Sequence, residues 1–77
     1  MLIIRMIYMK IQPYSKKELA LAYGPDMSMS GALNRLSAWI KGNPQLMEAL
    51  ASSGYRNGQR MLTSYQVRLI FDYLGEP

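Results

Sequence analysis

The residues that could take part in chemistry are mostly basic. The 77-residue chain has nine Lys and Arg, five Asp and Glu, and neither histidine nor cysteine. Without an imidazole or a thiol, the chain lacks the usual general base near neutral pH, the thiol nucleophile and the main ligands of zinc. We therefore expect no catalytic residue, no metal site and no cofactor.

The carboxylates have structural roles in the expected helices and turns. Glu18 belongs to a helix cap, Asp26 to a turn, and Asp72 to an ion pair on the surface of a helix. Glu76 lies near the end of the sequence, and Glu48 has no assigned role. A metal-carboxylate site needs at least two such groups to converge, and nothing in the spacing indicates that they do.

The basic residues favour a polyanionic partner. The net charge is +4 and the isoelectric point is about 9.6. A soluble basic protein without a polyanionic partner could have the same net charge, so the positions of the charges are more informative. Lys16 and Lys17 fall in the first turn of an expected helix, where cations oppose the helix dipole. Arg56 and Arg60 flank an Asn-Gly turn signal. Long cationic side chains that project from such a turn do not pack on the hydrophobic core.

Local sequence signals predict the first two helices. Ser15 and Glu18 have the spacing of a capping box, so a helix begins there and ends at Gly24 before a proline. A second helix is expected over residues 31–41, capped by Ser28 or Ser30. Its apolar residues have the spacing of one helical face, which places them in the core: Ala32, Leu33, Leu36, Trp39 and Ile40.

Two more helices are expected in the second half of the chain. Asn43 followed by Pro44 starts a helix that runs to Gly54. Thr63 and Gln66 form a second capping box, and the helix that follows has the buried stripe Val67, Ile70, Phe71 and Leu74 and closes at Gly75.

The apolar N-terminal segment has alternative interpretations. Residues 2–11 have the composition of a strand that is apolar on both sides, and Pro13 closes it. Met9 could instead be the natural start, which would make the preceding residues an extension. The segment lacks the features of a signal peptide, and Arg5 and Lys10 make it too short for a membrane span.

We expect a cytoplasmic protein with a single domain over residues 1–77, in which residues 1–12 are a strand or extension and residues 13–77 form the core.

The segment ELALAYG, residues 18–24, resembles the first helix of a helix-turn-helix motif. In that motif a small residue such as Ala20 allows the second helix to approach, and Gly24 makes the turn. Gly24 and Trp39 are fifteen positions apart. In a compact motif the turn and the tryptophan-type core position of the second helix are closer together in the sequence. The expected fold class is mainly α: a small helix-turn-helix bundle of about four helices with a short β-hairpin, similar to a winged helix.

Two families share features with this sequence. The stretch from Gly54 to Ile70, with GYR followed by LT, QV and LI, resembles the wing and following helix of MerR and excisionase-type proteins. That resemblance implies double-stranded DNA as the partner and a regulatory or accessory role. The order YSKKELALAYGPD, LNRLSAWI and GYRNGQRMLTSYQVRLIFDYLGEP over residues 10–77 also resembles a short bacterial family known only as a domain of unknown function.

The expected DNA contacts are Lys16, Lys17, Ser30, Asn34, Arg35, Lys41, Arg56 and Arg60.

The alternative function is that of a protein-interaction or dimerisation module. Tyr65, Leu69 and Tyr73 form a second, half-apolar stripe on the last helix. Together with the two-sided N-terminal strand, this stripe would suit a self-complementary homodimer.

Overall fold

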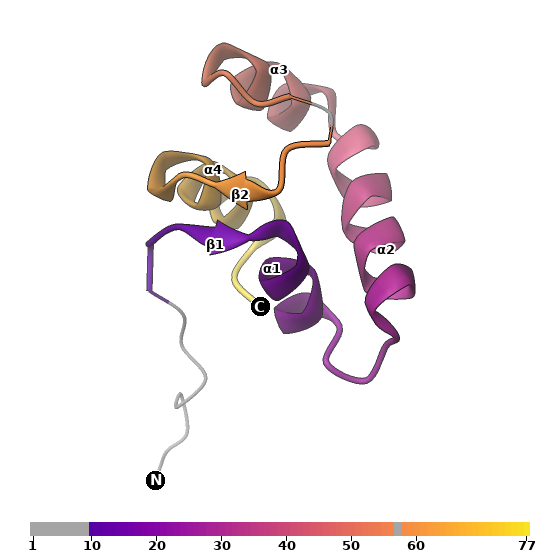
Figure 1. The fold of residues 1–77 in the computed structure, drawn as a ribbon. Coiled ribbons are helices and arrows are strands. Elements are labelled where there is room, and N and C mark those ends of the chain that lie inside the picture. The colour runs from indigo at the N-terminus through magenta and orange to yellow at the C-terminus, as the bar shows by residue number, and fades with distance from the viewer. Residues whose placement is uncertain (1–9, 57) are drawn as a thin grey trace, which may run out of the picture.

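The computed structural model describes residues 10–56 and 58–77. In this part of the chain, short β1 (Tyr14–Ser15) leads into α1 (Lys16–Tyr23), which is followed by α2 (Met29–Lys41) and α3 (Pro44–Ser52). Then come short β2 (Met61–Leu62) and α4 (Ser64–Leu74). The expected mainly helical fold with four helices and a short antiparallel strand pair is confirmed (Figure 1).

Most of the predicted N-terminal strand lies outside the described residues. The prediction covered residues 2–11, and the structure describes only Lys10 and Ile11 of these. Neither residue belongs to a strand, and Ile11 is exposed. The first strand within residues 10–56 and 58–77 is the two-residue β1, beyond Pro13.

Both predicted capping boxes are present. The Ser15 hydroxyl accepts from the Glu18 N–H at 3.0 Å, and the Glu18 carboxylate accepts from the Ser15 N–H at 2.9 Å. Thr63 and Gln66 make the same reciprocal pair at the start of α4, with both distances 3.1 Å. Each box satisfies backbone groups that a helix end would otherwise leave without partners.

The two middle helices also begin at polar caps. The Ser28 hydroxyl accepts from the Gly31 N–H at 3.2 Å, so α2 begins two residues earlier than expected. Asn43 caps α3 by accepting from the Leu46 N–H at 3.1 Å, and Pro44 occupies the first helical position. Proline is favoured there because its missing N–H would have no helical partner.

The helices and β2 bury one shared hydrophobic core. Each fully buried Leu, Ile or Val contributes about 1.5–3 kcal/mol relative to exposure. The core consists of Leu19, Ala20, Ala32, Leu36, Ile40, Leu46, Leu50, Leu62, Val67, Ile70 and Phe71. Trp39 was predicted to be a core residue, and this was wrong: it is 38% exposed and meets the Tyr23 ring edge-on, with centroids 5.7 Å apart.

The strand pair joins distant parts of the chain. Tyr14 faces Leu62 and Ser15 faces Met61 in antiparallel register. The expected hairpin would have paired β2 with the residues before the Asn-Gly turn, but its partner is β1. Because the two strands are antiparallel, the start of α1 lies beside the residue before β2, whereas α4 begins near the opposite end of the strand pair (Figure 1).

Two further observations concern the described residues 10–56 and 58–77. None of their helices combines the length and hydrophobicity needed to span a bilayer. They also contain no cluster of three or more His, Cys, Asp or Glu side chains that could hold a metal ion.

Candidate functional site

Three of the predicted DNA-contacting residues surround one open groove. Lys16 and Lys17 come from the first turn of α1, and Arg60 comes from the residue before β2. The groove has a volume of about 560 Å³, and we call it the basic groove. Its described lining consists of Ser15, Lys16, Lys17, Leu33, Gly58, Gln59, Arg60 and Met61, and it includes no carboxylate.

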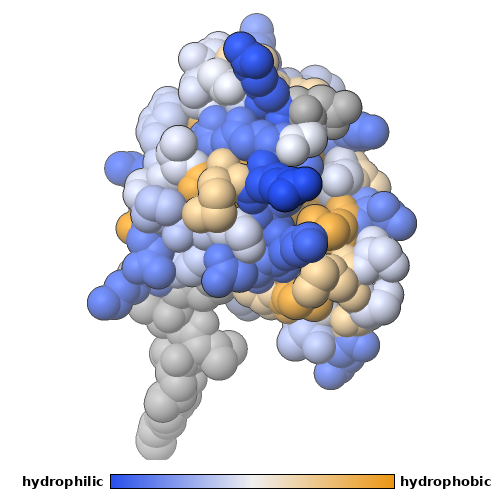
Figure 2. Space-filling model, viewed as in Figure 1, coloured by the Kyte–Doolittle hydropathy of each residue, from blue (hydrophilic) through white to orange (hydrophobic). Residues whose placement is uncertain are grey.

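The strand pairing explains why these cations converge. The Lys16 N–H donates to the Arg60 carbonyl oxygen at 2.7 Å, which extends the pairing of β1 and β2 by one bond. The backbones of Lys16 and Arg60 are therefore neighbours, although 44 positions separate the two residues in the sequence. Figure 2 shows a band of hydrophilic side chains across the centre of this face, beside a hydrophobic patch.

The loop that carries Arg60 has a defined turn. The Gln59 N–H donates to the Arg56 carbonyl at 3.0 Å, and Gly58 has a φ of 87°. That φ lies in the left-handed region, which glycine adopts without steric cost. Gly58 thus lies in a turn, as the sequence predicted.

A buried glutamine fixes this loop to the core. Gln66 is only 2% exposed, and its side-chain oxygen accepts from the Gln59 side chain at 2.6 Å. Its amide nitrogen donates to the Ser53 hydroxyl at 3.1 Å, at the end of α3. Gln59 also donates to the Met61 carbonyl at 2.7 Å. Sequence reasoning assigned Gln66 to the helix cap and missed the other bonds, because their partners lie seven and thirteen residues away.

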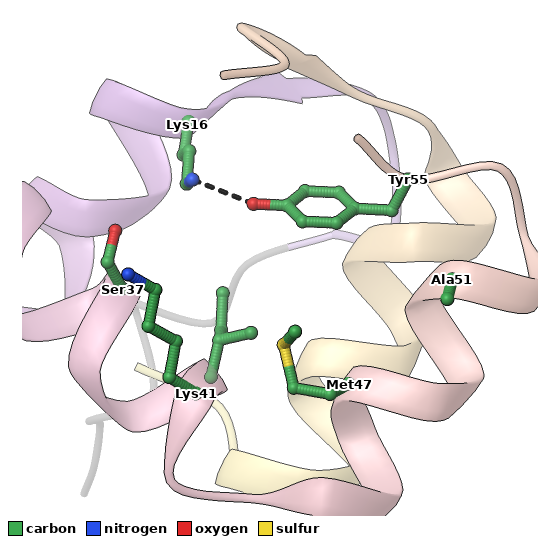
Figure 3. Close-up of a pocket in the computed structure, with 7 residues that line it drawn as sticks. Lys16, Ser37, Lys41, Met47, Ala51 and Tyr55 are labelled. Carbon is green, nitrogen blue, oxygen red and sulfur yellow. Dashed lines mark hydrogen bonds between the residues drawn. The ribbon is translucent and has the colours of Figure 1, made fainter. Parts of the chain in front are cut away.

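Lys16 lies between the basic groove and a second cavity. Its Nζ donates to the phenolic oxygen of Tyr55 at 2.7 Å and lies 5.4 Å from the ring centroid (Figure 3). The two distances together place the nitrogen near the extension of the C–O bond rather than over the ring face. The contact is therefore a hydrogen bond and not a cation–π interaction. Lys41 lines this second cavity with Lys16, so it too belongs to this side of the molecule.

Arg35, another predicted DNA contact, does not line the basic groove and instead contacts the end of α1. Its Nη2 donates to the Tyr23 carbonyl at the end of α1, at 2.6 Å, and its guanidinium lies 4.7 Å from the Trp39 ring centroid. Gly24 gives it room, because a Cβ there would lie 2.6 Å from Arg35 Nη2. The glycine ends α1 with a φ of −140°, which is not a left-handed conformation, and the nearest atoms to such a Cβ belong to the flexible side chains of Arg35 and Met27.

Family comparison assigns the whole described fold to one group. The family model described as "Domain of unknown function (DUF4248)" matches residues 10–77, which include both strands and all four helices of the described chain. The chain belongs to the DUF4248 family. Searches of curated proteins and of solved structures found no significant match to this DUF4248 domain. The similarity to MerR and excisionase-type proteins therefore has no support from these searches.

The other predicted DNA contacts lie outside the two cavities of this DUF4248 domain. Ser30 and Asn34 are exposed on α2, and neither lines the basic groove or the cavity beside Lys41. Helical spacing places Ser30, Asn34 and Lys41 on the same face of α2. Arg56 is exposed on the loop before the turn, and its backbone N–H donates to the Gln59 side chain at 3.1 Å.

The predicted interaction stripe of the DUF4248 domain is only partly exposed. Tyr65 is 60% and Tyr73 is 41% exposed, whereas Leu69 is half-buried and packs against the core. Beside them, Arg68 and Asp72 form the predicted ion pair at 3.9 Å. Both side chains are largely exposed, so the pair contributes at most about 0.5 kcal/mol.

The hydroxyl of Tyr23 connects α1 to the end of the described chain. It donates to the Gly75 carbonyl, 52 positions away. Burial raises the pKa of Tyr23 from 10.0 to about 12, and the nearby negative charge of Glu76 acts in the same direction. This DUF4248 domain is thus held together by polar contacts at both ends of α1.

Proposed function

We propose that this DUF4248 domain binds double-stranded DNA without catalysing a reaction, as a cytoplasmic regulator or accessory factor. The observation that carries the proposal is the basic groove, where Lys16, Lys17 and Arg60 meet with no carboxylate among the described lining residues. Phosphate contacts by such residues supply most non-specific DNA affinity, because they release counterions from the duplex.

The position of the two lysines favours an anion in the groove. Lys16 and Lys17 occupy the first turn of α1, where the helix dipole already contributes partial positive charge. Cations in that turn are unfavourable by roughly 0.3–1 kcal/mol each. A phosphate near the groove would offset this cost, and it would also approach Arg60.

Helix α2 is the element that we propose to enter the major groove. It follows α1 after a short connection, Gly24 to Ser28, in the order of a helix-turn-helix motif. Ser30, Asn34 and Lys41 share one of its faces and would contact base edges or phosphates. Arg56 would contact phosphate from the loop, whereas Arg35 is already held by the Tyr23 carbonyl and is omitted from the interface.

A titration with random duplex DNA tests the proposal. We expect affinity to fall steeply with salt, with a slope of log affinity against log salt of roughly −3 to −4 for about four neutralised phosphates. Fluorescence anisotropy of a labelled duplex at several salt concentrations measures this slope. Absence of binding at low salt would refute the proposal.

A second candidate function is homodimerisation or binding of a protein partner. The observation that favours it is the exposure of two large aromatic side chains, Tyr65 and Tyr73, on the same stripe of α4. Sedimentation equilibrium of the parent and of a Tyr65→Ser, Tyr73→Ser variant distinguishes the possibilities. A dimer that the double substitution dissociates supports this function, and a parent monomer at tens of micromolar excludes the homodimer.

A further inference from the structure

A second cavity lies between α1, α2 and α3, and we call it the α2–α3 pocket. Its described lining consists of Lys16, Ser37, Ile40, Lys41, Met47, Ala51 and Tyr55 (Figure 3). Ile40, Met47 and Ala51 give it an apolar wall, whereas the ammonium, hydroxyl and phenol groups lie around them. The pocket therefore combines a hydrophobic surface with several hydrogen-bond donors.

The charge of the α2–α3 pocket has no compensation among its described lining residues. Lys16 and Lys41 both line it, and no Asp or Glu does. Lys16 is half-buried, and its hydrogen bond at 2.7 Å goes to a neutral partner, the Tyr55 hydroxyl. An ammonium group has three donors, so this bond leaves Lys16 able to donate to an anion. Bonds between an ammonium and an anionic acceptor are stronger than neutral ones.

The size of the pocket limits what can occupy it. Its volume is about 230 Å³. An apolar cavity of about 150 Å³ accommodates benzene, whereas drug-sized ligands occupy about 300–1,000 Å³. The space therefore suits a single ring or a branched hydrocarbon group that bears one small anionic group.

We propose that the α2–α3 pocket binds a small organic carboxylate whose hydrocarbon body is about the size of one aromatic ring. The ring lies against Met47 and Ala51, and the carboxylate accepts from the ammonium groups of Lys16 and Lys41. This site is separate from the basic groove, although Lys16 lines both. Occupation of the pocket neutralises charge beside the groove, so the carboxylate lowers the affinity of the domain for any polyanion.

Binding of benzoate to the full chain, without DNA, tests the pocket independently of the proposed function. For a ligand of this size we expect a dissociation constant on the order of 1 mM. Methyl resonances of Met47, Ala51 and Ile40 report the location. Benzamide has the same shape without the charge, and acetate has the charge without the ring. Each should bind about tenfold more weakly than benzoate, because benzamide lacks the charge that the lysines bind and acetate lacks the ring that contacts the apolar wall.

Three substitutions separate pocket binding from general charge effects. Lys41→Gln should weaken benzoate binding roughly tenfold through loss of a charge-assisted bond. Ala51→Leu leaves the charge unchanged and fills the apolar part of the pocket, so it should abolish the methyl shifts. Lys17→Gln removes the same charge as Lys41→Gln, but Lys17 lies outside the pocket and this variant should bind benzoate like the parent.

Several outcomes would overturn the pocket proposal. It fails if benzamide binds as well as benzoate, if Lys17→Gln and Lys41→Gln weaken binding equally, or if the methyl shifts lie outside the pocket. Circular dichroism melts establish that each variant is folded. If Ala51→Leu does not fold, the comparison of Lys41→Gln with Lys17→Gln decides. Absence of DNA binding leaves these expectations unchanged.

Discussion

Arg35 joins the C-terminal end of α1 to the middle of α2 by donating to the Tyr23 carbonyl oxygen at 2.6 Å. The guanidinium also lies 4.7 Å from the Trp39 ring centroid, one helical turn along the same helix. Because the carbonyls at a helix end lack helical partners, this bond satisfies a group that would otherwise need water. Arg35 is therefore part of the scaffold that sets the angle between α1 and α2.

The first prediction is that Arg35→Ala destabilises the fold. Loss of a hydrogen bond from a charged donor and of the contact with Trp39 should lower the free energy of unfolding by about 2–3 kcal/mol. Urea unfolding measures the effect. Arg60→Ala is the matched control, since Arg60 is exposed and should change stability by less than about 0.5 kcal/mol. Equal stabilities of the two variants would show that the Tyr23 contact has no structural role.

The second prediction concerns the buried amide that holds the Arg60 loop. Gln66→Leu keeps the approximate volume but removes the bonds to Thr63, Gln59 and Ser53. Leaving such groups without partners should cost about 1–3 kcal/mol in the free energy of unfolding. Gln45→Leu makes the same chemical change at an exposed site on α3 and should be nearly neutral. Thermal melts compare the two, and a Gln66→Leu melt like that of the control would contradict the network.

The third prediction is that the N-caps of α1 and α4 each contribute about 1 kcal/mol. Ser15→Ala and Thr63→Ala remove the hydroxyl oxygens that accept from Glu18 and Gln66. Chemical denaturation should show both losses. Ser52→Ala, at an exposed position in the last turn of α3, is the control. Stabilities unchanged by both cap substitutions would mean that the helices do not depend on these bonds.

The fourth prediction is a loss of stability at alkaline pH that depends on Tyr23. Its folded-state pKa is about 12 against an ordinary value of 10.0, because burial disfavours the phenolate. The folded state therefore binds the proton more tightly than the unfolded state. This contribution is fully present below pH 10 and decreases as the pH rises from 10 towards 12.

Urea midpoints measured across that pH window test the Tyr23 prediction. The parent should lose stability between pH 10 and 12 more steeply than Tyr23→Phe, in which the titrating group is absent. Both proteins are first compared at neutral pH, where the phenol is protonated, to measure the loss of its bond to Gly75. Parallel pH profiles for parent and variant would contradict the raised pKa.

Local signals predicted the helices because the hydrogen bonds that cap a helix join residues three or four positions apart. Ser15 with Glu18 and Thr63 with Gln66 are visible in the sequence for that reason. The periodicity also identified the core side of α2. It failed for Trp39, which lies at the edge of the apolar stripe, where only the neighbouring elements decide whether a side chain is covered.

Contacts between distant residues were not predictable from the same signals. The strands contain two residues each, which is too short for any periodicity, so the pairing of β1 with β2 could not be read from the sequence. The convergence of Lys16 and Arg60 depends on that pairing, and so does the basic groove. The place of Arg35 was missed for a related reason: its partner is a backbone carbonyl, which every residue type provides.

The last prediction tests whether the basic groove contacts phosphates. Changing Lys17 and Arg60 together to Gln removes two cations that line the groove without removing a side-chain hydrogen bond found in the described chain. The slope of log affinity against log salt should become shallower by about 2, and affinity should fall similarly for every duplex sequence, because phosphate contacts carry little sequence information. Arg60→Gln alone should change the slope by about 1. Arg68→Gln removes the same charge from α4, outside the groove lining, and should leave the slope unchanged. Equal slopes for Arg60→Gln and Arg68→Gln would assign DNA affinity to overall charge, and the basic groove would then have no specific part in it.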